Sequence, residues 1–259
     1  MTAATTTTTR DPGPWLWAVT GVAWLVTLVL MVVPAAMGTM PSMAAADLAG
    51  GAAPVVTVIV FAVGWVVMVA AMMLPTTVPM ARLVVVVTSD VPDRRRVLAT
   101  FAGAYVAVWS AAGLVGLGVA ALVARVTAGV PGHLVLAGAL ALAGAFQFSP
   151  LKKRCLTLCR DPRAVLFTRY RRGAGGAWSL ALRHALDCLG CCWALMAVMF
   201  AVGSGGLVWM LGLTAVMVAE KNAPWGRRLV APLGVALLVA AVLLVGLAVA
   251  APAPMPHHM

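Results

Sequence analysis

Five cysteines are the residues best suited to chemistry in this chain, and all of them lie between positions 155 and 192. Three fall in the run Cys188-Leu-Gly-Cys191-Cys192, and the other two are four residues apart. If both stretches are helical, cysteines four residues apart share one face of their helix. Thiolates are soft ligands for Cu(I) and zinc, and paired thiols can also exchange electrons. The predicted thiol ligands are Cys155, Cys159, Cys188, Cys191 and Cys192.

Methionine and polar side chains accompany the thiols. Met72 and Met73 are predicted as neighbouring ligands, because thioether sulfur also suits Cu(I). Just beyond them, Pro75 and Pro79 are predicted to end the helix and to free backbone carbonyls. Ionisable side chains at membrane depth usually mark a site or a pathway. The residues predicted to surround the ligands are Gln147, Lys152, Asp187, Glu220 and Lys221.

A second group of methionines, with a spacing of three, lies between the first two apolar segments. Thioether ligands remain usable in an oxidising compartment, where thiols would be oxidised. We therefore predict an outer metal site at Met37, Met40 and Met43.

The elements that must position these residues are transmembrane helices. The chain is 63% hydrophobic and 10% charged, with a mean hydropathy of +1.03, which is too apolar for a soluble domain. The apolar runs are continuous and lack the alternation of barrel strands. We predict an all-α polytopic membrane helix bundle with about seven transmembrane helices, six being the alternative. The predicted ranges are Trp15–Ala36, Val55–Leu74, Val97–Ala124, His133–Phe148, Arg183–Gly203, Leu207–Lys221 and Leu229–Ala251.

The positive charge predicts the orientation of the bundle. The formal net charge is +11, and every basic residue except Arg125 falls on one side of the predicted helices. Lys and Arg collect in cytoplasmic loops, so this side is predicted to be cytoplasmic, and no nucleic-acid partner is expected. Residues 1–14 then form a disordered cytoplasmic tail and 149–183 a basic cytoplasmic loop, both joined to the bundle at 15–251. Residues 252–259 form a short extracytoplasmic tail.

The predicted location is the cell (plasma) membrane, with several passes through the bilayer. The first apolar run is about twenty residues long, which exceeds the apolar region of a signal peptide. We therefore interpret it as the first helix. The expected partners are the lipid bilayer and a metal ion, together with a membrane protein partner or a second copy of the chain.

Several motifs together resemble a known family. The chain is similar, over roughly residues 65–221, to a bacterial family of predicted metal-binding integral membrane proteins, a domain of unknown function often labelled copper chaperone. The resemblance implies metal handling. Where that family usually carries Met-Asn, this chain has Gly205-Gly206, so no role of those two residues carries over. The motifs that carry the resemblance are Ala71–Pro75, Gln147–Lys152 with Cys155 and Cys159-Arg160, Cys188–Met196, Trp209-Met210 and Glu220-Lys221.

These observations leave three hypotheses. The first is Cu(I) handling by a membrane chaperone or transporter, with zinc as the alternative metal. The second is an enzyme, either a thiol redox protein or a copper-dependent oxidase. The third is an assembly subunit in which cysteines only pack. No phosphate-binding loop or zinc-protease motif is present in the sequence, so ATP-driven transport by this chain alone is not expected.

Overall fold

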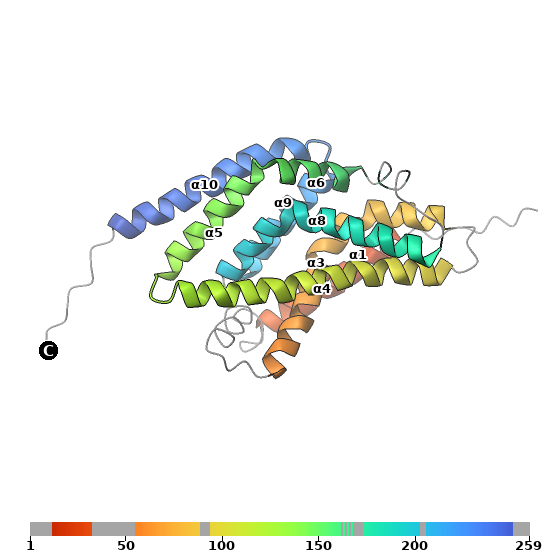
Figure 1. Ribbon diagram of the computed structural model, residues 1–259, viewed down its shortest axis with the longest axis horizontal. Coiled ribbons are helices and arrows are strands. Elements are labelled where there is room, and N and C mark those ends of the chain that lie inside the picture. The colour runs from red at the N-terminus through yellow and green to blue at the C-terminus, as the bar shows by residue number, and fades with distance from the viewer. Residues whose placement is uncertain are drawn as a thin grey trace, which may run out of the picture.

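The computed structural model describes residues 12–32, 55–88, 94–161, 163, 165, 167, 173–202 and 206–250. All regular structure in these ranges is helical, which confirms the predicted all-α class (Figure 1). The helices are α1 (Gly13–Val32), α3 (Val55–Val87), α4 (Arg94–Val126), α5 (Gly132–Gln147), α6 (Pro150–Arg160), α8 (Ala174–Val202), α9 (Gly206–Asn222) and α10 (Gly226–Ala250).

Four helices among the described residues are long and apolar enough to cross a membrane. Their spans are Val58–Val87, Arg95–Val126, Ala174–Ala201 and Gly226–Ala250. A fifth span is available if α5 and α6, which are bent by 66° relative to each other, count as one broken crossing. The chain is thus compatible with a multi-pass membrane protein, but the predicted count of seven is not confirmed. The difference arises because α9 has 17 residues and the apolar part of α1 is short.

Helix α3 corrects one prediction, because it continues through both prolines to Val87. Pro79 has no N–H group to bond the carbonyl of Pro75, which normally weakens a helix. In the structure the Asn222 side chain donates a hydrogen bond to that carbonyl at 3.3 Å. A partner from α9 therefore satisfies the group that the proline leaves without its helical bond.

The described residues within 149–183 are largely helical. Helix α6 begins after Ser149, whose hydroxyl accepts a hydrogen bond from the Lys152 N–H at 3.1 Å, with Pro150 in the first turn. Helix α8 begins at Ala174, well before the predicted Arg183. Its early turns are helical because Leu180 and Ala181 are buried against α3 and α4. The basic residues of this segment that the structure describes therefore lie on helices.

Helix α8 is the centre of the bundle and packs against α4, α5, α6 and α9. Figure 1 shows α5 beside α10, and α4 running along α8. The approach of α6 to α8 depends on Gly190, where an added Cβ would lie 2.7 Å from the Cys155 sulfur. Large apolar side chains on the outward faces stay exposed, as expected for contact with lipid.

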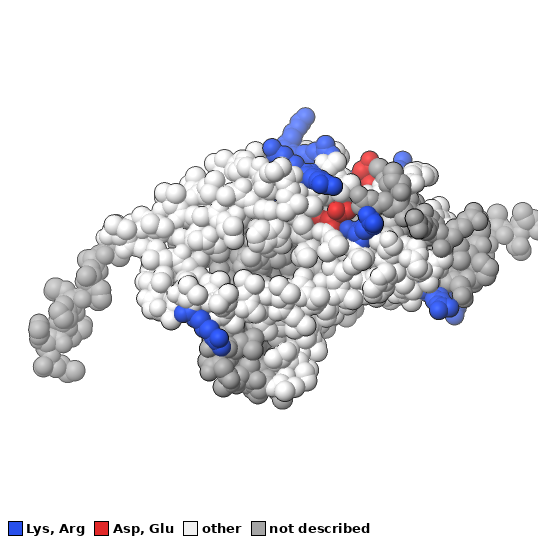
Figure 2. All heavy atoms as spheres, viewed as in Figure 1, with Lys and Arg blue, Asp and Glu red and all other residues white. Residues whose placement is uncertain are grey.

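Charged side chains are unevenly distributed. Figure 2 shows basic groups gathered over α6 and the turn between α9 and α10, with a further basic group near the turn between α4 and α5. The last turn of α4 carries Arg125. Most of the predicted N-terminal tail and all of the C-terminal tail lie outside the described residues.

Candidate functional site

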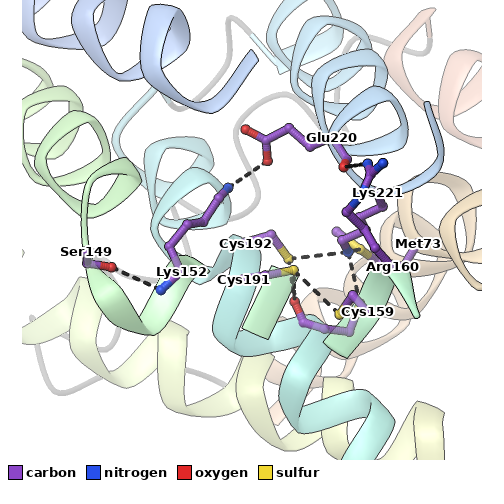
Figure 3. A network of polar contacts seen from close by, with 10 residues as sticks. Met73, Ser149, Lys152, Cys159, Arg160, Cys191, Cys192, Glu220 and Lys221 are labelled. Atoms are coloured by element: carbon purple, nitrogen blue, oxygen red, sulfur yellow. Dashed lines mark hydrogen bonds and ion pairs between the residues drawn. The ribbon is translucent and has the colours of Figure 1, made fainter. Parts of the chain in front are cut away.

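The site lies where α6, α8 and the end of α9 meet α3. Four of the five cysteines converge there, together with two lysines and a glutamate (Figure 3). Cys188, Cys191 and Cys192 are all 1% exposed, so their thiols are removed from water. No disulfide joins them, and all five cysteines are free.

One pair of neighbouring thiols comes from different helices, Cys159 on α6 and Cys191 on α8. Their sulfur atoms are 3.8 Å apart. The thiols of Cys191 and Cys192 each donate to the backbone carbonyl of Cys188 at 3.0 Å. This carbonyl orients both side chains within one turn of α8.

The ammonium of Lys221 reaches into the sulfur group from α9. Its Nζ lies 2.9 Å from the Cys188 sulfur, 3.9 Å from the Cys192 sulfur and 3.8 Å from the thioether sulfur of Met73. The ammonium is thus in contact with three sulfur atoms, and thiolate sulfur is the form of cysteine that binds metals. The site therefore combines soft ligands with a fixed positive charge.

A buried ion pair fixes the neighbouring part of α9. Lys152 Nζ contacts Glu220 Oε2 at 2.6 Å, and the two side chains are 1% and 2% exposed. Arg160 donates hydrogen bonds to the backbone carbonyls of Glu220 and Ala223, the latter at 2.7 Å. Because Arg160 follows Cys159 directly, these bonds tie the thiol of α6 to the end of α9.

Two residues next to the thiols were not predicted from sequence. The Tyr105 hydroxyl lies 3.4 Å from the Cys188 sulfur, and its ring stacks on His184 with centroids 6.1 Å apart. His184 is buried one turn before Cys188, and a helical spacing of four was the signal that could have identified it. Tyr105 comes from α4, and no local pattern in the sequence links it to the cysteines.

The other predicted residues are placed as follows. Cys155 packs its sulfur against Gly190, and Met72 is fully buried in the core that contains the thiols. Gln147 is buried beside Gly234 of α10. Asp187 is half-buried on α8. The outer methionines Met37, Met40 and Met43 lie outside the described residues.

No preformed polydentate metal site is found in the described part of the chain. No group of three or more histidine, cysteine, aspartate or glutamate side chains there is arranged to hold a metal ion. The structure brings together thiols from two helices, Cys159 and Cys191, and the thioether of Met73 contacts the nearby Lys221 ammonium.

The comparisons with known proteins agree with the chemistry of these residues. A family model described as PpoB2, copper chaperone, matches residues 62–244, which include all of the described cysteines and both lysines of the site. No curated protein and no solved structure matches the chain.

Proposed function

The chain belongs to the copper chaperone family, and from this premise we propose that it binds Cu(I) through thiolates at the junction of α6 and α8. The proposed ligands are Cys159 and Cys191, with Cys188 and Cys192 as adjacent thiols and Met73 as a thioether neighbour. Bound Cu(I) is the cargo of the protein. The proposed role is a membrane copper chaperone or transporter that keeps this cargo away from water.

The observation that carries the proposal is the separation between the sulfurs of Cys159 and Cys191. Metal–thiolate bonds of about 2.3 Å place two sulfur ligands about 3.8 Å apart at a tetrahedral metal and about 4.0 Å apart at a trigonal one. The two sulfurs are 3.8 Å apart and come from different helices. Cu(I) prefers soft sulfur ligands, so a third sulfur from Cys188, Cys192 or Met73 would complete a trigonal site around it.

Buried methionines provide further soft sulfur atoms in the core that contains the thiols. Met196, Met199, Met210 and Met217 belong to the same core cluster as Cys188 and Cys192. Thioether sulfur holds Cu(I) weakly enough to pass it on, so this column supports a route through the helices. We propose that the thiol end faces the cytoplasm, as the distribution of basic residues predicts.

Thiol redox chemistry is the second candidate, because the Cys159–Cys191 pair would also be the pair to form a disulfide. The two candidates differ in what the thiols require. A dithiol mechanism proceeds without metal, whereas copper handling is abolished by a Cu(I) chelator.

Elemental analysis tests the proposal. We expect the purified protein, loaded anaerobically with Cu(I), to retain about one copper ion per chain after desalting. The variant with Cys188, Cys191 and Cys192 changed to serine should lose that copper, because all three α8 thiols of the site are gone. Gel filtration and helix content would establish that the variant is folded. A folded variant that retains its copper, or a wild-type protein that binds none, would contradict the proposal.

A further inference from the structure

We propose that Lys221 is a specificity-determining residue, whose fixed positive charge makes the sulfur site favour a monovalent ion over a divalent one. This inference rests on the proposed function, because it assumes that metal binds at the thiols. It adds a reason why the site would hold Cu(I) rather than Zn(II), for which thiolates are also good ligands.

The first support is the set of atoms around the ammonium. Its hydrogen-bond contacts are to the sulfur atoms of Cys188, Cys192 and Met73, which come from two helices. Lys221 is only 6% exposed, so water screens its charge poorly. A metal ion bound by any of these sulfurs would therefore lie within a few ångströms of a weakly screened positive charge.

The second support is that the neighbouring carboxylate is engaged elsewhere. Glu220, the adjacent residue, directs its carboxylate to Lys152 at 2.6 Å. Figure 3 shows the Glu220 and Lys221 side chains diverging, the first toward Lys152 and the second toward the thiols. In the described part of the chain, the Lys221 ammonium is therefore in contact with sulfur atoms, while the Glu220 carboxylate pairs with Lys152.

The third support is that the backbone around Lys221 is held in place. Asn222 donates to the Pro75 carbonyl on α3, and Arg160 on α6 donates to the carbonyls of Glu220 and Ala223. A Cβ on Gly226 would approach the Ala219 and Glu220 carbonyl oxygens and the Arg160 guanidinium, so the turn after α9 is also tightly packed. The backbone that carries Lys221 is therefore fixed relative to α3 and α6.

Charge selectivity follows from Coulomb's law. The repulsion between the ammonium and a bound ion is proportional to the charge of the ion, so it is twice as large for Zn(II) as for Cu(I). The environment is apolar, which makes this difference larger than it would be in water. Removing the charge should therefore favour Zn(II) relative to Cu(I) when the ion is held by the sulfur atoms beside the ammonium.

The test compares the Cu(I) and Zn(II) affinities of Lys221→Met with those of the wild-type protein, by anaerobic competition with a chromophoric chelator for each metal. We expect the ratio of the two affinities to shift toward zinc by at least about tenfold. Lys221→Gln is a second neutral variant, and Lys221→Arg should keep the wild-type ratio. Lys153→Met removes an exposed charge from α6 and serves as the matched control.

The two possible failures are distinguishable. If the wild-type protein binds Cu(I) but neither neutral variant shifts the ratio by more than about twofold, the inference is wrong and the proposed function stands. If the wild-type protein binds no Cu(I), the proposed function fails and the inference fails with it. A merely structural role of Lys221 would weaken both metals together and leave the ratio unchanged.

Discussion

Replacing Lys152 with methionine is expected to lower the free energy of unfolding by about 3 to 5 kcal/mol, because it leaves a buried carboxylate without its partner. Lys152 and Glu220 are 1% and 2% exposed and 2.6 Å apart. The carboxylate would have to give up its charge or be reached by water, and either disrupts the contact between α6 and α9. Reversible denaturant unfolding of the protein in detergent, followed by far-UV circular dichroism, measures the change.

A double variant separates the pair from the packing around it. Lys152→Met with Glu220→Met removes both charges and keeps bulky side chains, so it should recover most of the lost stability. Lys153→Met, at an exposed position on the same helix, should change stability by less than about 0.5 kcal/mol. A single Lys152→Met variant as stable as the wild-type protein would show that the pair does not hold α6 to α9.

Changing Cys159 to serine is expected to weaken Cu(I) binding at least about a hundredfold, whereas the same change at Cys155 should alter it less than about threefold. Loss of a residue that only supports a ligand already costs 10- to 100-fold in affinity, and Cys159 is a proposed ligand. Its sulfur lies 3.8 Å from that of Cys191, while the Cys155 sulfur packs against Gly190. Competition against a Cu(I) chelator of known affinity gives both values.

Cys155 is a close control for Cys159, because it lies one turn earlier on the same helix. Its thiol is buried against α8, and the thiol of Cys159 is half-buried. Equal losses in the two variants would mean that α6 contributes through packing alone. A larger loss at Cys155 would move the proposed site to the other side of Gly190.

The class of fold and most helix positions follow from the sequence, because long apolar runs are strong signals. The predicted range His133–Phe148 differs from the observed Gly132–Gln147 by one residue at each end. Sequence patterns predicted the wrong helix end where a contact with another helix decides how far the helix continues. A proline normally ends a helix, but Asn222 supplies the hydrogen bond that lets α3 continue past Pro79.

The sequence indicates which residues belong to the candidate site, but it does not indicate which of them contact one another. Soft ligands concentrated in a short stretch of chain indicate metal chemistry, and adjacent acidic and basic residues indicate a buried charge. The contact between Lys221 and Cys188 joins residues 33 positions apart, and the ion pair between Lys152 and Glu220 joins residues 68 positions apart. Periodicity within one helix contains no information about such pairs, so Tyr105 was missed altogether.

Copper X-ray absorption spectroscopy on protein loaded anaerobically with one equivalent of Cu(I) tests the central claim most directly. We predict a first shell of sulfur at about 2.3 Å, and a loss of sulfur from that shell when Cys159 and Cys191 are both changed to serine. A shell of nitrogen or oxygen, or a sulfur shell that is unchanged in the double variant, would contradict binding of Cu(I) between α6 and α8.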